Sequence, residues 1–425
     1  MTPMPGGNPY RPGVGTQPRY FAGRERELRR FRSALGGAPE IPANVRLTGL
    51  RGVGKTVLLS RFSEVARDAG WEPAVLELEP RHEREPELLT VLTTALRSLE
   101  QRVSRGARTR QRLTGEWPEP AEAVLATPVE AVACDRHEML AGAAKAVGQL
   151  ALVIEGVSVR VDPSVSDAAP ELSKALLGVV RTTVDSGRRG VVILLDEAQV
   201  LRDDRRASGS RSLSMLLAAV VPLQRAEVPL ALVLCGLPTL TNNLLAARTY
   251  SERMFRGEHI GRLDDDEARA AFTQPLDGTG VSVDERLIGA VLDAVEGYPY
   301  FIQLWGAELW DAADAADVQH LSTELLQVVE SDVYRRLDLD FYEPRLSSLT
   351  PAEQDVMIAS GTCPYPPLVV ADLHRRSEKT AANVNVLLGR LVEAGVLYRV
   401  RKGQYEYTAP RFSEFLQRRS ERRAW

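Results

Sequence analysis

One short stretch of this sequence has residue types that could hold a phosphate group. Residues 49–56 read Gly-Leu-Arg-Gly-Val-Gly-Lys-Thr, the pattern G-x-x-x-x-G-K-[ST]. Glycines in such a turn let backbone N–H groups face an anion, and the helix that follows adds partial positive charge. Lys55 would bridge the β- and γ-phosphates of a nucleotide, and Thr56 would offer its hydroxyl to Mg²⁺. An ordinary glycine turn is the competing interpretation. The residues expected to bind the nucleotide here are Gly49, Leu50, Arg51, Gly52, Val53, Gly54, Lys55, Thr56 and Val57.

A pair of acids supplies the second half of this chemistry. Asp196 and Glu197 directly follow the most apolar run of the chain, Val191 to Leu195. Asp196 would hold Mg²⁺ through water, and Glu197 would polarise the water that attacks the γ-phosphate. Two solvated acids at a strand end are the alternative. Because the glycine-rich turn occurs in the same chain, the pair favours a site for triphosphate hydrolysis.

The elements that must position these residues follow an alternating pattern. Unalternating apolar runs such as 191–195 and 230–234 are typical of parallel strands that are buried on both faces. Strands alternating with helices predict an α/β fold with a doubly wound parallel sheet. The expected strands are 45–49, 73–78, 191–195 and 230–234, with a β-like pair near 152–161 that turns near Gly156. The expected helices between them are 55–69, 86–103 and 171–186.

The rest of the chain divides into further parts. Residues 1–18 are rich in Pro and Gly and predict a flexible tail, while 104–135 predict an exposed excursion. After Leu263 four helical stretches follow, at 264–276, 284–296, 300–312 and 321–339. We therefore expect a core at 19–262 with an insertion at 104–162, a helical lid at 263–345 and a small last domain at 346–425.

The segment that precedes the first strand carries a family resemblance. Residues 21–28, Phe-Ala-Gly-Arg-Glu-Arg-Glu-Leu, resemble a segment of AAA+ ATPases related to archaeal origin-recognition proteins and to signal-transduction ATPases with numerous domains (STAND). In those families this segment lies beside the adenine. The resemblance implies a P-loop NTPase fold, ATP and Mg²⁺ as cofactors, and nucleotide contacts from Gly23 and Arg24. Residues 192–199, which end in Asp-Glu-Ala-Gln, also resemble ATPases of secretion and transposition systems.

Three more positions follow from this resemblance. Thr239 lies where the family places a polar residue that helps to position the attacking water, but the usual Asn is absent, which argues for slow hydrolysis. Arg253 lies where relatives present an arginine to the nucleotide of a neighbouring subunit, and a surface arginine is the alternative. Pro299, in Gly-Tyr-Pro, resembles the part of the lid that packs on the nucleotide, although a plain helix end would also explain it.

The last domain resembles a winged helix-turn-helix. Helical patterns at 369–375 and 378–394 are followed by a β-hairpin at 396–408 with its turn at Lys402 and Gly403. In such domains the second helix enters the major groove and the wing meets phosphates. Residues 346–425 carry twelve Lys and Arg against eight Asp and Glu, while docking of a protein partner is the alternative to DNA. The expected DNA contacts are Lys379, Thr380, Asn383, Arg399, Arg401 and Lys402.

Composition excludes several other classes. The 425 residues carry a net charge of −4, so no whole-molecule positive field attracts nucleic acid or membrane. Cys134, Cys235 and Cys363 are far apart, which argues against a disulfide framework and fits a reducing cytoplasm. No run approaches eighteen apolar residues, so no membrane span is expected.

Together these patterns predict an enzyme that hydrolyses ATP. We expect a slow ATP-dependent switch whose nucleotide state, ATP or ADP, repositions the lid and a DNA-contacting winged helix. A regulatory scaffold that docks a protein partner, and an oligomeric motor that self-associates through Arg253, are the alternatives.

Overall fold

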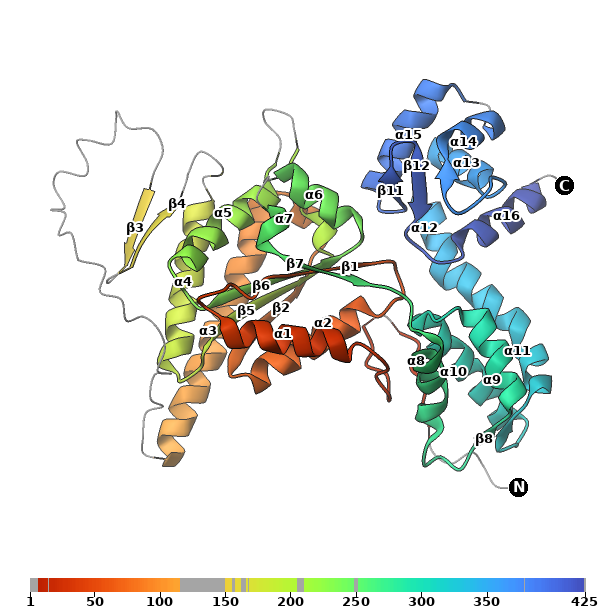
Figure 1. Ribbon diagram of the computed structural model, residues 1–425, viewed down its shortest axis with the longest axis horizontal. Coiled ribbons are helices and arrows are strands. Elements are labelled where there is room, and N and C mark those ends of the chain that lie inside the picture. The colour runs from red at the N-terminus through yellow and green to blue at the C-terminus, as the bar shows by residue number, and fades with distance from the viewer. Residues whose placement is uncertain are drawn as a thin grey trace.

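A parallel sheet forms the centre of the molecule. The computed structural model describes residues 7–13, 15–114, 150–154, 157–161, 166, 168–204, 210–247, 251–377 and 379–423. All five strands of the central sheet are parallel, in the order β2-β5-β6-β1-β7 (Figure 1). They are β1 (Val45–Gly49), β2 (Trp71–Glu77), β5 (Gly190–Asp196), β6 (Leu230–Gly236) and β7 (Arg256–Ile260). This sheet confirms the predicted doubly wound α/β fold.

Both faces of the sheet are covered by helices. Successive side chains of a strand point to opposite faces, so Val192 and Leu194 of β5 join one apolar core and Ile193 joins the other. The first core includes residues of α1 (Glu25–Gly37) and α2 (Lys55–Asp68). The second includes residues of α3 (Glu85–Thr114), α4 (Ala169–Asp185) and α5 (Ser212–Arg225). Burial on both sides explains why the strand run does not alternate.

Short elements complete this part. Strands β3 (Leu150–Ile154) and β4 (Val157–Val161) pair antiparallel, as expected, while the predicted turn residue Gly156 lies outside the described residues. Helices α6 (Thr239–Ala247) and α7 (Ser251–Met254) lead into β7. Strand β7 was not predicted, because this edge strand reads Arg-Gly-Glu-His-Ile and three of its five residues are exposed.

A helical region follows the sheet. Its helices are α8 (Asp265–Thr273), α9 (Glu285–Val295), α10 (Pro299–Ala315), α11 (Thr323–Arg336) and α12 (Glu343–Ser347). A 3-10 turn, η3 (Gln274–Leu276), follows α8, and a π-helical segment, η4 (Leu337–Tyr342), joins α11 to α12. Strands β8 (Ser282–Val283) and β9 (His320–Leu321) pair in parallel between the helices. We call α8 to α11 the lid, and η4 with α12 the linker segment.

The last part, which we call the C-terminal unit, combines helices with a small antiparallel sheet of order β10-β12-β11. Its first helix begins with a capping box formed by Thr350 and Glu353. Its elements are α13 (Pro351–Ser360), β10 (Leu368–Val369), α14 (Val370–Arg376), α15 (Ala381–Glu393), β11 (Leu397–Arg401), β12 (Gln404–Tyr407) and α16 (Phe412–Arg423). Two helices, α14 and α15, and the β11–β12 hairpin therefore occur in the predicted order, with α13, β10 and α16 in addition.

The predicted flexible tail is wrong for residues 8–13 and 15–18. The Tyr10 ring is 3% exposed, and its hydroxyl donates to the Phe272 carbonyl at 2.5 Å. Gly306 makes room for this ring on α10, since a Cβ built there would lie 2.4 Å from Tyr10 Cδ1. Asn8 adds a hydrogen bond from its amide to the Asp311 carboxylate at 2.8 Å. One aromatic anchor and its hydrogen bonds order this stretch despite its polar composition. We call residues 8–13 and 15–18 the amino-terminal strap.

The exposed excursion expected at residues 104–135 is also wrong in its first part. Helix α3 continues to Thr114, and the side chain of Ala107 is buried. Residues 115–149 lie outside the described residues. Among the helices that the structure describes, none is both long and apolar enough to cross a membrane.

Candidate functional site

The glycine-rich turn lies where β1 ends and α2 begins. Gly52 and Gly54 have φ angles of 79° and 85°, in the left-handed region that favours glycine. These two residues bend the chain so that α2 starts at Lys55, with Gly54 as its N-cap. The sequence pattern therefore folds into the strand–turn–helix context in which such a turn can hold an anion.

Lys55 is buried at this turn. Its side chain is enclosed, and its ammonium donates to the Leu50 carbonyl at 2.9 Å. Burial lowers the pKa of Lys55, and the neighbouring groups Cys235, Glu197 and Asp196 oppose this change. An ammonium group that donates to one carbonyl still has N–H donors with which to bind an anionic ligand.

Thr56 meets Asp196 across the sheet. The Thr56 hydroxyl donates to Asp196 Oδ2 at 2.6 Å, and Asp196 Oδ1 accepts the Glu197 N–H at 2.8 Å. Asp196 ends β5, and Thr56 lies on α2, which follows β1; since β6 lies between β5 and β1, the contact depends on the strand order. Hydroxyl and carboxylate oxygens are ligands that Mg²⁺ prefers, so this pair fits the ion predicted here. When bound beside phosphates, Mg²⁺ would neutralise part of their charge.

The described residues contain no group of three His, Cys, Asp or Glu side chains that could hold a metal by themselves. A magnesium ion at Thr56 and Asp196 would therefore take its other ligands from water and phosphate, as Mg²⁺ does in nucleotide sites.

Gln199 is a residue for which sequence analysis gave no role. Its side-chain amide donates to the Glu197 carboxylate, and its Oε1 accepts the Leu237 N–H at 3.0 Å. A Cβ on Gly236 would lie 2.4 Å from Gln199 Oε1, so only glycine lets this bridge form. Gln199 thus joins Glu197 to the end of β6. In the sequence, only the Asp-Glu-Ala-Gln motif pointed to this role.

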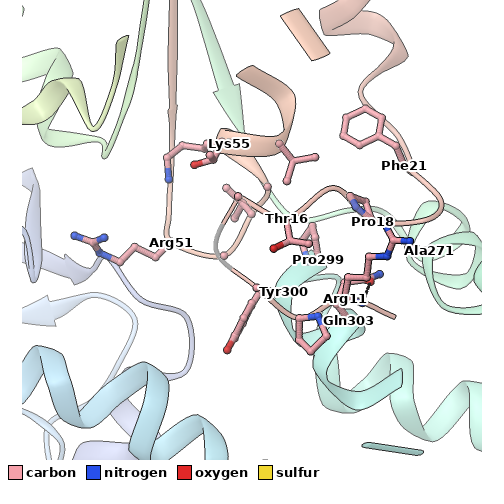
Figure 2. Close-up of a pocket in the computed structure, with 18 of the residues that line it drawn as sticks. Arg11, Thr16, Pro18, Phe21, Arg51, Lys55, Ala271, Pro299, Tyr300 and Gln303 are labelled. Carbon is pink, nitrogen blue, oxygen red and sulfur yellow. Dashed lines mark hydrogen bonds between the residues drawn. The ribbon is translucent and has the colours of Figure 1, made fainter. Parts of the chain in front are cut away.

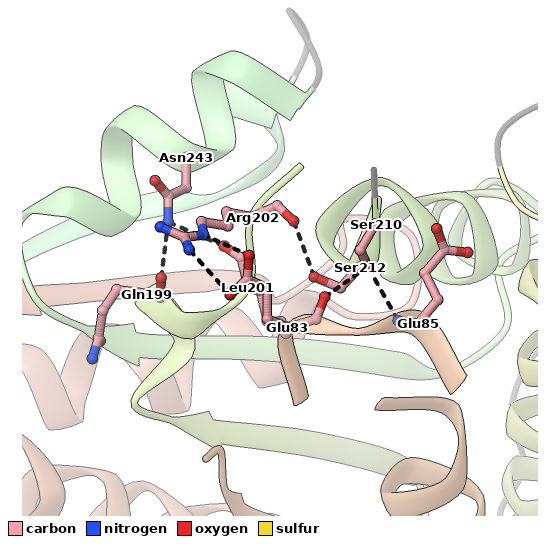
Figure 3. A network of polar contacts seen from close by, with 8 residues as sticks. All are labelled: Glu83, Glu85, Gln199, Leu201, Arg202, Ser210, Ser212 and Asn243. Atoms are coloured by element: carbon pink, nitrogen blue, oxygen red, sulfur yellow. Dashed lines mark hydrogen bonds and ion pairs between the residues drawn. The ribbon is translucent and has the colours of Figure 1, made fainter. Parts of the chain in front are cut away.

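A polar network holds the turn that carries Gln199. Figure 3 shows the Asn243 amide reaching the carbonyls of Gln199 and Leu201, at 2.9 and 3.1 Å. In the same network Arg202 pairs with Glu83 at 2.8 Å, and the Ser210 hydroxyl donates to the Glu83 carbonyl. These bonds tie the loop after β5 to α6 and to the turn after β2, so the position of Glu197 rests on three elements.

A cavity of about 270 Å³ opens beside the glycine-rich turn. Figure 2 shows Arg51 and Lys55 toward one end of it, and Phe21 and Pro18 toward the other. Of the residues predicted to bind nucleotide or catalyse, Arg24, Arg51, Gly52, Val53, Gly54, Lys55, Thr56, Val57, Glu197 and Pro299 line it. Gly23, Gly49, Leu50, Asp196 and Thr239 do not line it, although Asp196 touches Thr56 and Leu50 holds Lys55.

The amino-terminal strap and Arg24 line another side of the cavity. The amino-terminal strap contributes residues such as Arg11 and Thr16, and the Arg11 N–H donates to Gln303 Oε1 at 3.0 Å. Residue Arg24, predicted from the family resemblance, donates to the Gly261 carbonyl at 2.6 Å. Burial lowers the pKa of Arg24. The sequence pattern did not reveal the strap as a wall of this cavity.

The lid and the linker segment form the remaining wall. The Tyr300 N–H donates to the Gly52 carbonyl at 3.2 Å, so α10 begins directly on the glycine-rich turn. Tyr300 stacks on Phe341 with ring centroids 5.3 Å apart, and the Arg345 guanidinium lies 4.2 Å from the Phe341 centroid. We call Tyr300, Phe341 and Arg345 the lid cluster, and Lys55, Thr56, Asp196 and Glu197 the strand cluster.

Arg253 lies away from this cavity. Its side chain is exposed on α7, just before β7. The first residue of β7, Arg256, pairs with the first residue of β1, Val45, at the end of the sheet opposite the glycine-rich turn. The structure therefore does not bring Arg253 to the cavity of its own chain. Thr239 is buried at the start of α6.

The six residues predicted to contact DNA all lie on the C-terminal unit. Arg399, Arg401 and Lys402 are exposed on the β11–β12 hairpin. Lys379 is paired with Asp355 at 3.8 Å, and the Thr380 hydroxyl accepts the Asn383 N–H, which caps α15. The structure therefore gives Lys379 and Thr380 roles within the unit itself.

The last helix is joined to the linker segment by ion pairs. Arg418 and Arg419 lie on α16 and pair with Asp338 and Glu343 of the linker segment. Helix α16 is therefore packed against this segment.

A comparison with one solved structure supports the fold. A Walker-type ATPase of Pyrococcus abyssi is similar with a TM-score of 0.52 and 17% identity, covering 95% of this chain and 97% of that one. Two further structures have TM-scores below 0.5. The ORC1 protein of Aeropyrum pernix in complex with DNA has 0.45, with 16% identity over 96% of each chain. The RuvB Holliday junction branch migration motor of Thermotoga maritima has 0.43, with 14% identity over 90% and 92%.

The sequence itself matches two family models. No curated protein matches the chain. A model described as a domain of unknown function, DUF8462, matches residues 339–416, and one described as AAA ATPase domain matches residues 20–233, just over half of the chain. The glycine-rich turn, the Asp-Glu pair and the sheet that joins them all lie within or beside the second match, and the chain belongs to the AAA ATPase domain family.

Proposed function

We propose that this protein binds ATP with Mg²⁺ at the cavity beside residues 51–57, hydrolyses it slowly, and uses the nucleotide state to reposition its lid and C-terminal unit. The observation that carries the proposal is the 2.6 Å contact between Thr56 and Asp196 at the start of α2. It joins the two halves of the predicted site, which are 140 residues apart in sequence.

Each group of the strand cluster then has a role. Lys55 and the N–H groups of the turn bind the phosphates, and Thr56 with Asp196 holds the ion. Glu197 lines the cavity, and it polarises the attacking water there as a general base. Gln199 keeps the Glu197 carboxylate in place through its amide. Phe21 and Pro18 lie at the end of the cavity where the adenine would bind, and Arg24 also lines the cavity.

Two features support slow turnover. The position after β6 offers Thr239 in place of the usual Asn, and Thr239 does not line the cavity. Arg253 is exposed and does not line this cavity, so Arg253 could stabilise a transition state only at the nucleotide of another subunit. An isolated chain should therefore hydrolyse ATP slowly.

For the C-terminal unit we propose a winged-helix module that contacts duplex DNA. The order of α13 to β12, with a hairpin that exposes Arg399, Arg401 and Lys402, supports this assignment. In this proposal residues 19–262 form the ATPase core, 263–345 the lid and 346–425 the DNA-contacting domain. The free, buried thiols of Cys235 and Cys363 are consistent with a reducing cytoplasm.

Nucleotide binding is tested by titrating ATP and ADP against the full chain and its Lys55→Ala variant. We expect the variant to lose about 100-fold or more in affinity, because a buried cation that binds phosphate is removed. Lys174→Ala on the exposed side of α4 is the matched control. Unchanged affinity in Lys55→Ala would show that the turn is not the binding site.

DNA contact is tested by measuring duplex binding over a range of salt concentrations. The double variant Arg401→Ala, Lys402→Ala should bind more weakly and lower the slope of log affinity against log salt by about 2. Arg286→Ala, an exposed arginine on α9, should change neither.

Duplex binding and gel filtration separate the alternatives. If the wild-type chain binds no duplex at low salt, a scaffold that docks a protein through this unit is favoured. If gel filtration with an ATP analogue reveals a multimer that requires Arg253, an oligomeric motor is favoured.

A further inference from the structure

Helix α15 of the C-terminal unit has an exposed face in its first half. Val384, Leu387 and Leu388 point into the core of the unit and are buried, whereas Asn383 and Val386 are exposed. The Val386 side chain is 55% exposed. Because Asn383 and Val386 are three residues apart, their side chains are neighbours on one side of the helix. This face therefore combines one amide with one branched apolar group.

Asn383 differs from the other polar side chains at this end of α15. Lys379 is held in an ion pair, and the Thr380 hydroxyl caps the helix. The Asn385 amide donates to the Ala381 carbonyl at 3.0 Å, so this side chain is folded back along the helix. The Asn383 backbone N–H is bonded to Thr380, but its side chain makes no hydrogen bond to a residue that the structure describes. Its amide N–H groups and its carbonyl oxygen are thus available to a ligand.

The residue types of this face match one kind of base pair. In the major groove adenine presents an acceptor and a donor that a side-chain amide can meet together, and thymine presents a methyl group to apolar side chains. Guanine is most often bound there by arginine or lysine. Residues 381–389 contain neither, and the first basic residue of α15 is Arg390. The first half of the helix therefore favours A·T over G·C pairs.

Basic side chains lie beside this face, on the hairpin. Arg399 and Lys402 are exposed there. A groove of about 620 Å³ runs between the hairpin turn, α14 and the start of α15, and His374, Ala381, Lys402 and Gln404 are among the residues that line it. Phosphate contacts fix the position of a protein on a duplex, whereas base contacts select the sequence. The hairpin can therefore hold the DNA backbone while α15 meets the bases.

The end of α15, not its start, lies against the ATPase core. A Cβ built on Gly395, just after the helix, would lie 3.3 Å from Leu237 Cδ1, just after β6. Figure 1 shows the start of α15 at the outer edge of the C-terminal unit, away from the central sheet. Asn383 therefore lies on the part of the helix that a duplex can approach.

We propose that α15 selects A·T base pairs in the major groove, with the Asn383 amide bonded to adenine and Val386 against a thymine methyl group. This inference rests on the proposed DNA contact of the C-terminal unit and names the sequence class that the unit prefers. Side chains three residues apart on a helix are about 5–6 Å apart, and base pairs are stacked about 3.4 Å apart. The two side chains thus contact the same base pair or adjacent ones.

The test measures binding of the full chain to three duplexes of equal length. One is rich in A·T pairs, one is rich in G·C pairs, and the third is the A·T-rich duplex with uracil in place of thymine, which removes only the methyl groups. We expect the A·T-rich duplex to bind about tenfold or more tightly than the G·C-rich one. Uracil should lower the affinity about three- to fivefold, as expected for one buried methyl group.

Four variants assign these differences to side chains. Val386→Ala should remove the difference between thymine and uracil, and Asn383→Ala should lower the preference for A·T pairs about tenfold. Arg399→Ala should weaken binding to all three duplexes alike, because a phosphate contact carries no sequence information. Val328→Ala, at a 65% exposed valine of α11, is the matched control and should change nothing. All four should unfold at nearly the wild-type temperature, since these side chains are exposed.

Three results would overturn the inference and leave DNA contact in place. They are equal affinity for A·T-rich and G·C-rich duplexes, an A·T preference that uracil does not reduce, and a thymine–uracil difference that persists in Val386→Ala. Failure of the proposed DNA contact gives a different result, since the wild-type chain would then bind none of the three duplexes at low salt, and the inference would fail with it.

Discussion

The strand cluster and the lid cluster face the same cavity, but they differ in how their polar groups are satisfied. In the strand cluster Lys55 bonds to a carbonyl, Thr56 to Asp196, and Glu197 to Gln199. In the lid cluster Arg345 carries a buried nitrogen that bonds to no described residue. The first cluster is thus held in shape by the protein alone. The second leaves one buried donor, Arg345 Nε, without a hydrogen bond to any described residue.

The largest effect is expected from a substitution that removes the general base of the strand cluster but keeps the shape of its side chain. Glu197→Gln should lower the rate of ATP hydrolysis about 100-fold or more, because a general base becomes a neutral amide. Its affinity for ATP should stay within about threefold of wild type, since phosphate binding rests on Lys55. Phosphate release measures the first quantity and nucleotide titration the second.

Glu64→Gln, a change of an exposed acid on α2, is the control for this experiment and should leave the rate unchanged. If Glu197→Gln hydrolyses ATP at nearly the wild-type rate, the general base lies elsewhere and the strand cluster only binds.

A smaller effect is expected from the residue that positions Glu197. Gln199→Ala removes the amide that bridges the Glu197 carboxylate and the Leu237 N–H. The hydrolysis rate should fall about tenfold through misorientation of the base, with KM for ATP little changed. Steady-state kinetics separates kcat from KM. A faster enzyme would mean that the amide restrains Glu197 and does not orient it for attack.

The smallest expected effect concerns the strap that borders the lid. Tyr10→Phe keeps the ring beside Gly306 but loses the hydroxyl bond to the Phe272 carbonyl. The free energy of unfolding should fall by about 1 kcal/mol, the usual net value of one buried hydrogen bond. Urea denaturation measures it, with Tyr20→Phe at a more exposed ring as the control. No measurable loss would indicate that the strap is held by ring packing alone.

Much of the strand cluster could be predicted, because the sequence motifs that form it are local. The glycine-rich turn is eight consecutive residues, and Asp196 directly follows a strand whose apolar run is visible in the sequence. Since parallel strands present their carboxyl ends at one edge, two such motifs in one sheet were expected to meet, and the Thr56–Asp196 contact joins them.

The opposite side of the cavity depends on contacts between distant segments, which local patterns do not encode. Tyr10 finds its place only because Gly306, nearly 300 positions later, lacks a side chain. Arg345 reaches the cavity only after lid and linker have folded back over the glycine-rich turn. The prediction of a flexible tail rested on average polarity, which does not reveal that a single buried ring, that of Tyr10, can order the strap.

The seat of that ring also bears on how a ligand enters and leaves. Arg11, Pro12, Gly13, Gly15, Thr16 and Pro18 border the cavity, and Tyr10 fastens this strap to α8 through its hydroxyl and to α10 through its ring beside Gly306. Exchange of a bound nucleotide would then depend on how readily the strap detaches. A side chain at position 306 would displace the Tyr10 ring and detach the strap, which would speed nucleotide release without altering any atom that binds phosphate.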